Sequence, residues 1–353
     1  MAYRRSNGKG RKPKKVEPAQ LSMLFVTPTI AGSGSEEFYV DLSQSASLLN
    51  RRFYRQGINW AVGSIKILSP IAAGSVIVQK LPSTWAMSNA WMKGFKAWQR
   101  MNNEALEENE SVRPRFLDFK IFADAQHHLD GFGANLIPNT YNQPPGGVLS
   151  AVQATAGEWE ASSFRIPDTT ILANTRDREI IAVGASYPGN GASGKNAVSL
   201  IEGYAASRAL PDIEDPNVPD DMSDADGVAP ENWITAVFNE GTEQSDEVLT
   251  DMRTENNIAP YPFENGANPA GGVFADTMYP GGANQLDGLQ YHDSELITGT
   301  TIGGTTHLDG GLFPCGLIKF AFSNAGATAN ALIQINLVPG NHRGYLCEPM
   351  TEM

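Results

Sequence analysis

The sequence predicts an all-β protein, a β-sandwich with long loops and one inserted helix. Glycine and proline supply 35 and 22 of the 353 residues, and this abundance is typical of many turns rather than of long helices. Short apolar runs rich in Val, Ile, Phe and Tyr alternate with those turns. Only one segment has the three- and four-residue apolar spacing of a helix.

The strand-like segments begin at Leu21, where the composition changes. Residues 64–69 partly alternate apolar and polar side chains, which is the period of a half-buried strand. We expect the segments of the first quarter of the chain to form an antiparallel series. They cover residues 21–26, 36–42, 58–68 and 75–81.

The expected helix covers about residues 84–108 and is an insertion among the strands. Ser83 and Thr84 are residues that can cap its start. Its basic residues come early and its acidic residues late, against the helix dipole, so packing of the apolar stripe must stabilise it. The stripe consists of Met87, Trp91, Phe95, Trp98, Met101 and Ala105.

Further strand-like segments follow the helix, separated by long polar stretches. The segments cover residues 116–124, 158–166, 178–186, 233–238, 316–323 and 331–338. The stretches are 135–147, 210–232 and 256–288. Loops this long are uncommon in a compact domain unless they have a function, so we expect them to build assembly or binding surfaces.

Charge is divided unevenly along the chain. The net charge is −13, and the first 16 residues carry seven basic side chains and no acid, so the remainder carries −20. We expect residues 1–20 to be a basic arm that is disordered alone, and residues 21–353 to form one domain with loop insertions. The basic residues of the arm are Arg4, Arg5, Lys9, Arg11, Lys12, Lys14 and Lys15.

The arm fits contact with nucleic acid, because its cations neutralise phosphates and release condensed counterions. Such binding is salt-sensitive and independent of base sequence. Residues 11–15 also suit a nuclear-import signal, and a solubilising tail is the third interpretation. No apolar run follows the arm as in a secretory signal, and no stretch of about 18 apolar residues predicts a membrane span.

A second basic cluster interleaves arginines with aromatic residues. Arg51, Arg52 and Arg55 surround Phe53 and Tyr54. These residues can stack bases and grip a nucleic-acid backbone. The arginines can equally pair with acids at a subunit interface, and both interpretations stay open.

Enzyme-like motifs are weak. Residues 189–195 have the GxxxxGK spacing of a phosphate-binding loop, but Asn196 replaces the Ser or Thr that would hold Mg²⁺, and Tyr187 and Pro188 separate the motif from the preceding strand-like run. We therefore favour a surface turn, with a P-loop-like NTPase at 189–196 as a weaker alternative. No GxSxG motif is present, and we expect no catalytic residues and no enzyme.

Metal binding also lacks a clear motif. The acidic loop at 212–226 fails the EF-hand template, so we expect a solvated loop and keep a divalent cation at a subunit interface as an alternative. The segment His127–Asp130 is interpreted as a loop pair of histidines rather than a metal site. Cys315 and Cys347 lack zinc spacing. We expect no cofactor.

A resemblance to a known family lies in three segments. They are MAYRRSNGKGRKPKK at the amino end, EEFYVDLSQSASLLNRRFYRQGINWAVGSIKIL as a first pair of strands, and ALIQINLVPGNHRGYLCEPM as the last strand and carboxyl tail. They cover about a fifth of the chain and resemble capsid proteins of small icosahedral single-stranded DNA viruses, in particular environmental relatives of the circular Rep-encoding group. The resemblance implies a single jelly roll of two four-stranded sheets, whose loops make subunit contacts and whose arm faces the genome. The Trp-rich helix and the short arm depart from the plainest members.

The expected function is therefore a structural capsid protein that assembles with many copies of itself into a closed shell and packages viral nucleic acid, most simply single-stranded DNA. Charged residues make up only 18% of the chain, which fits a subunit largely covered by its neighbours. We expect it in the virion and in the host nucleus during assembly. The alternative is a non-viral β-sandwich binding module, lectin-like or DNA-coating.

Overall fold

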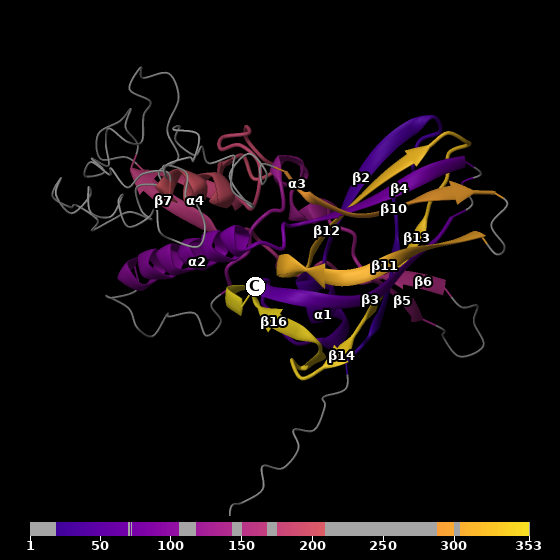
Figure 1. Cartoon of the computed structure of the whole chain (residues 1–353), viewed down its shortest axis with the longest axis horizontal. Helices are drawn as coiled ribbons and strands as arrows, with labels where there is room; N and C mark the ends of the chain where they lie inside the picture. The colour runs from indigo at the N-terminus through magenta and orange to yellow at the C-terminus, as the bar shows by residue number, and fades with distance from the viewer. Residues whose placement is uncertain are drawn as a thin grey trace, which may run out of the picture.

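The structure is a computed structural model, shown in Figure 1. It describes residues 19–69, 71, 73–105, 118–142, 150–167, 175–208, 288–299 and 304–352. The basic arm, the acidic loop at 212–226 and the strand expected at 233–238 lie outside these residues. In the part of the chain that is described, no helix is long and apolar enough to cross a membrane.

Eight strands form a sandwich of two four-stranded antiparallel sheets. The first sheet has the order β1 (Ser22–Val26), β13 (Leu332–Leu337), β3 (Ile58–Leu68), β11 (Thr305–Phe313), and the short β16 (Cys347–Pro349) also pairs with β3. The second has the order β10 (Gln290–Thr298), β4 (Ala73–Lys80), β12 (Leu317–Asn324), β2 (Gly34–Asp41). Counted along the chain these are strands 1-8-3-6 and 5-4-7-2, the order of a jelly roll. The predicted fold class is confirmed.

Alternating side chains build the core between the sheets. In β13, Ile333, Ile335 and Leu337 are buried and the intervening residues are half-buried. Trp60 of β3 is fully buried, and its indole nitrogen donates to the Ser43 hydroxyl at 3.1 Å. Burial of each such large side chain contributes about 2 to 3 kcal/mol, so the period-two pattern fixes which face of each strand turns inward.

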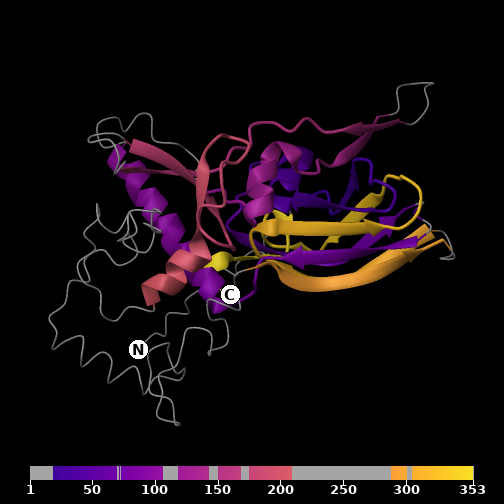
Figure 2. The same ribbon diagram turned by 90° about the horizontal axis from the view of Figure 1, so that it is seen from above.

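An insertion between β4 and β10, residues 81–289, carries its own secondary structure. Its strands are β5 (Asn139–Asn142), β6 (Ser150–Gln153), β7 (Ser163–Pro167), β8 (Thr175–Ile181) and β9 (Asn196–Ser199), and its helices are α2 (Trp85–Ala105), α3 (Ala125–Asp130), the 3-10 turn η2 (Phe132–Ala134) and α4 (Leu200–Arg208). Helices α2 and α4 and strand β7 lie beside the sandwich rather than in it (Figure 1, Figure 2). Strands β7, β8 and β9 form a separate small sheet.

A second hydrophobic cluster fills the insertion and joins it to the sandwich. Trp91 of α2 stacks on Phe95 at 5.2 Å and meets Phe119 edge-on at 5.9 Å. Leu317 of β12 and Met350 belong to the same cluster, so the insertion packs on the sandwich. The predicted helix is confirmed as α2, held by its aromatic stripe.

Three expectations were wrong in detail. The predicted single helix is joined by α3, α4 and α1 (Leu42–Asn50), which begins at the Asp41 cap. Of the segments expected as strands, 158–166 and 178–186 are confirmed as β7 and β8 of the small sheet, whereas the described part of 116–124 provides an isolated bridge from Phe122 to Ile181. The stretch 135–147 contains β5, which pairs with β6. The remaining short elements are β14 (Pro339–Gly340), β15 (Gly344–Tyr345), η5 (Pro314–Gly316) and η6 (Met350–Glu352).

Candidate nucleic-acid interface

The basic arm joins the fold at the carboxyl end of α1. The backbone N–H of Gln20 donates to the Asn50 side-chain oxygen at 2.9 Å. The Tyr345 hydroxyl donates to the Gln20 carbonyl at 2.7 Å. These contacts fix where the arm leaves the sandwich, directly beside the second basic cluster.

The arginines of that cluster project from the turn that follows α1. Arg51 adopts a left-handed conformation with φ 53°, which ends the helix, and Arg51, Arg52 and Arg55 are exposed. Tyr54 between them is buried against Trp60 and Tyr345, and its hydroxyl donates to the Arg343 carbonyl at 3.1 Å. The buried tyrosine therefore anchors the turn and leaves its arginines in solvent.

Sequence reasoning missed a fourth arginine at this place. Arg343 lies in the turn between β14 and β15, and its guanidinium donates to the Phe53 carbonyl at 2.6 Å. It is exposed, like the other three. The sequence gives no signal for this approach, because Arg343 and Phe53 lie 290 positions apart. We call Arg51, Arg52, Arg55 and Arg343 the arginine patch.

A pocket of about 260 Å³ opens next to the arginine patch. It is lined by Arg51, Arg52 and Phe53, by residues 156–159, and by three residues of α1. The Trp159 ring lies 6.2 Å from the Phe53 ring. The Lys120 ammonium sits 4.6 Å from the centre of the Trp159 ring. Guanidinium and aromatic groups in one concave place are the groups that contact phosphates and unstacked bases.

The buried carboxylate of Asp41 holds this arrangement together. Its oxygens accept from Ser43 N at 2.8 Å, Gln44 N at 3.2 Å, and the side chains of Gln56 and Trp159, each at 3.0 Å. Burial raises the pKa of Asp41 to about 6, and these hydrogen bonds oppose that rise. One side chain thus caps α1, joins it to β2 and orients Trp159.

The glycine-rich segment 189–195 does not have the arrangement of a phosphate-binding loop. Its Lys195 runs into strand β9 rather than into a helix. Its N–H groups are used within the loop: Gly191 N donates to the Lys195 carbonyl at 2.8 Å, and Gly189 N donates to Asn196 Oδ1 at 3.1 Å. Those donors are therefore not directed at a ligand, and the turn interpretation fits better than the NTPase alternative.

The two adjacent histidines lie on helix α3 rather than in a loop, and both are buried. Ala123 N donates to His127 Nδ1 at 3.1 Å, so Nε2 carries the proton and donates to Asn135 Oδ1 at 2.8 Å. His128 lies 3.0 Å from the Glu179 carboxylate. Within the described ranges no group of three or more potential metal ligands occurs.

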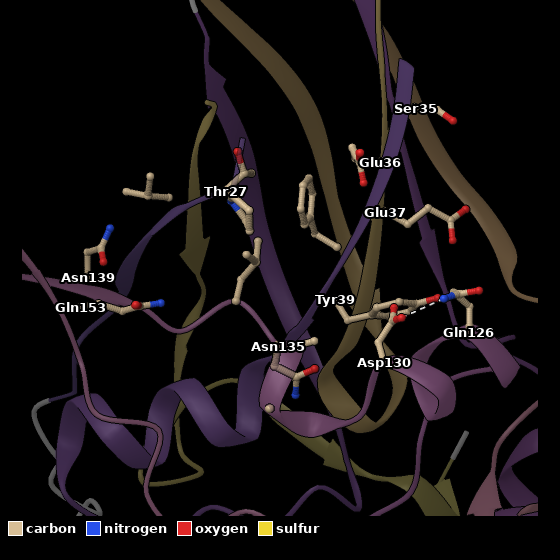
Figure 3. Close-up of a pocket in the computed structure, with 16 residues that line it drawn as sticks. Thr27, Ser35, Glu36, Glu37, Tyr39, Gln126, Asp130, Asn135, Asn139 and Gln153 are labelled. Carbon is tan, nitrogen blue, oxygen red and sulfur yellow. Dashed lines mark hydrogen bonds between the residues drawn. The ribbon is translucent and has the colours of Figure 1, made fainter. Parts of the chain in front are cut away.

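A larger cleft lies at the other end of β1 and was not predicted. Its volume is about 1110 Å³, and its walls are residues 26–28, the edge of β2 at 35–39 and the segment from Gln126 to Asn139, with Gln153. Figure 3 shows Glu36 and Glu37 on β2 and Asp130 beside Gln126 on the α3 wall. We call it the acidic cleft.

Comparison of the chain with protein-family models, with curated proteins and with solved structures found no match.

Proposed function

We propose that this chain is a structural capsid protein, whose copies assemble into a closed icosahedral shell and hold the viral genome, most simply single-stranded DNA. One observation carries the proposal. The arm with seven basic residues is attached through Gln20 to a jelly-roll sandwich beside the exposed arginine patch, so both basic elements can contact one polyanion. The proposal needs no chemical step and no cofactor.

The division of charge supports a polar orientation of the subunit. Outside the arm the chain carries −20, which repels nucleic acid, so the arm and the arginine patch set which end faces a genome. Multiplied over about 60 copies, seven charges supply roughly 400 cations to the inside of a shell. Localisation in the virion, and in the host nucleus during assembly, belongs to the same proposal.

Exposed apolar side chains support self-association. Leu296 and Tyr291 on β10 are 71% and 57% exposed, and Ile77 on the neighbouring β4 is 38% exposed. Apolar groups gathered on one sheet are typical of surfaces covered by another molecule. Charged residues make up only 18% of the whole chain, and such a composition suits contact between copies of the chain through this surface.

Size-exclusion chromatography followed by negative-stain electron microscopy tests the proposal. We expect the full chain to form uniform hollow particles, and the chain lacking residues 1–16 to form particles without nucleic acid. Absence of closed particles over a range of salt and pH would overturn the capsid function. Monomers or small oligomers would favour a binding module, and nucleotide binding abolished by Lys195→Ala would favour an NTPase.

A further inference from the structure

The acidic cleft runs along a free strand edge. On one side β2 pairs with β12, and among the described residues no strand pairs with its other side. The Tyr39 carbonyl points away from β12 and accepts from Leu136 N at 2.8 Å. Because hydrogen-bonding direction alternates along a strand, the peptide groups of Glu37 and Ser35 point the same way into the cleft. An extended peptide can pair with such an edge.

The charge of the cleft selects a basic occupant. Glu36, Glu37 and Asp130 line it and are exposed, and no lysine or arginine is among its described lining residues. The ammonium of Lys319 lies 2.8 Å from Glu37 and 3.2 Å from Asp124, so these two carboxylates share one positive charge. Glu36 and Asp130 have no cation within 4 Å in the described structure.

We propose that the acidic cleft docks the basic N-terminal segment of the same chain, residues 1–16, and that nucleic acid competes with the cleft for this segment. The segment carries seven positive charges and no negative one, which complements Glu36 and Asp130, the two cleft carboxylates that no described cation neutralises. Residues 2–12 contain no proline, so their N–H groups are available for pairing with an edge strand.

The segment is long enough to reach the cleft. Its point of attachment at Gln20 and the cleft residue Thr27 lie at opposite ends of β1, about 23 Å apart at the rise of a strand. The 18 residues before Ala19 span up to about 60 Å when extended. The five basic residues from Arg4 to Lys12 lie eight or more positions before Gln20, so each has enough chain to reach the carboxylates.

Tethering compensates for the weakness of the individual ion pairs. Exposed pairs contribute little and are screened by salt, but a short tether gives an effective concentration in the millimolar range. Nucleic acid offers many more phosphates than the cleft offers carboxylates, and it also releases counterions. It therefore displaces the segment from the cleft. Docking does not rest on the proposed function, whereas the competition does.

Zero-length carbodiimide cross-linking of the full chain tests the docking. We expect amide links from Lys9 or Lys12 to Glu36 or Asp130, and their loss when a single-stranded oligonucleotide is added. Mixing ¹⁵N-labelled and unlabelled protein separates links within one chain from links between copies. Links only between copies, or links from the segment to other carboxylates, would overturn docking within the chain.

A neutralised cleft tests the competition. The double variant Glu36→Gln/Asp130→Asn should bind an oligonucleotide about three- to tenfold more tightly, because the segment is no longer withheld. The control Glu295→Gln/Glu348→Gln removes the same charge from exposed positions outside the cleft and should change affinity less. Equal gains in both variants would overturn the competition. Failure of the arm to bind nucleic acid at all would instead overturn the proposed function, whatever the cross-links show.

Discussion

The two ends of strand β1 carry opposite charge. At the Gln20 end, the arm joins the fold beside four exposed arginines, whereas the far end opens into a cleft lined by three carboxylates. The ends are rigidly connected, because β1 pairs with β13 over its whole length. A net charge of −13 conceals this polarity. If the protein binds a polyanion as proposed, the position of charge along one strand, rather than its total, sets which end of the sandwich attracts it.

Neutralising the arm should change the affinity of the positive end for nucleic acid more than any other substitution considered below. With all seven basic residues of the arm replaced by Gln, the slope of log affinity against log salt should fall by about six for duplex DNA, or about five for a single strand. Between 50 and 200 mM salt, six units correspond to a factor of 10³–10⁴. Fluorescence anisotropy at several salt concentrations measures the slope, and an unchanged slope would show that the arm does not bind.

Removing the Asp41 carboxylate should destabilise the junction between β2 and α1, the helix that leads into the arginine patch. Asp41→Ala leaves four N–H donors without their acceptor in a buried place, so we expect a loss of about 3 kcal/mol in the free energy of unfolding. Urea unfolding followed by circular dichroism measures this loss. Ser22→Ala, which removes an exposed hydroxyl on β1, is the control and should cost less than about 0.5 kcal/mol. Equal losses would contradict the role given to Asp41.

The cleft end should be sensitive to acid through His127. Burial lowers the pKa of His127 to about 4, against a hydrogen bond to Asn135 that favours the charged form. The unfolded chain therefore takes up the proton first, near pH 6.5, and stability falls as the pH drops toward 4. Asp41 acts in the opposite direction, because its raised pKa gives stability that is lost as the pH rises through 6.

Comparison with His127→Gln isolates the histidine, because Asp41 is present in both proteins. Between pH 6.5 and 5, the wild type should lose roughly 2 kcal/mol of unfolding free energy relative to the variant. Urea unfolding at four pH values measures the difference. A constant difference across this range would mean that His127 does not titrate as its burial requires.

The sandwich strands were predictable because one face of each strand packs against the core. This leaves an alternation of apolar and polar residues in the sequence. Strand β13 shows this alternation, with Ile333, Ile335 and Leu337 inward. Helix α1 was missed because it has only nine residues, too few for a clear helical period, and because it begins at the buried Asp41 cap, a contact that the fold creates.

The site was predictable only where its residues are adjacent in sequence. The cluster from Arg51 to Arg55 is local, and its aromatic spacing gave the signal. Arg343 and Trp159 join this cluster through folding alone. The acidic cleft likewise brings together β2 and α3, which are separated in sequence by α1, β3, β4 and α2. Contacts between distant segments leave no periodic mark, so the cleft had no signal in the sequence.

Replacing two arginines of the arginine patch should have the smallest of these effects, and it separates two interpretations of the cluster. If Arg51 and Arg52 contact phosphates, Arg51→Gln/Arg52→Gln should lower the salt slope by about two, roughly a factor of ten between 50 and 200 mM salt. The control Arg165→Gln removes an exposed arginine that is paired with Asp177 in the insertion, and it should leave the slope unchanged.

An unchanged slope in the double variant, together with loss of particles by electron microscopy, would instead assign these arginines to a contact between subunits. The arm would then bind nucleic acid without support from the fold. In that case the arginine patch would contact acidic residues of a neighbouring copy rather than phosphates. The two ends of β1 would then differ in their partners as well as in their charge. The salt slope and the particle yield of one variant therefore decide what the positive end of β1 binds.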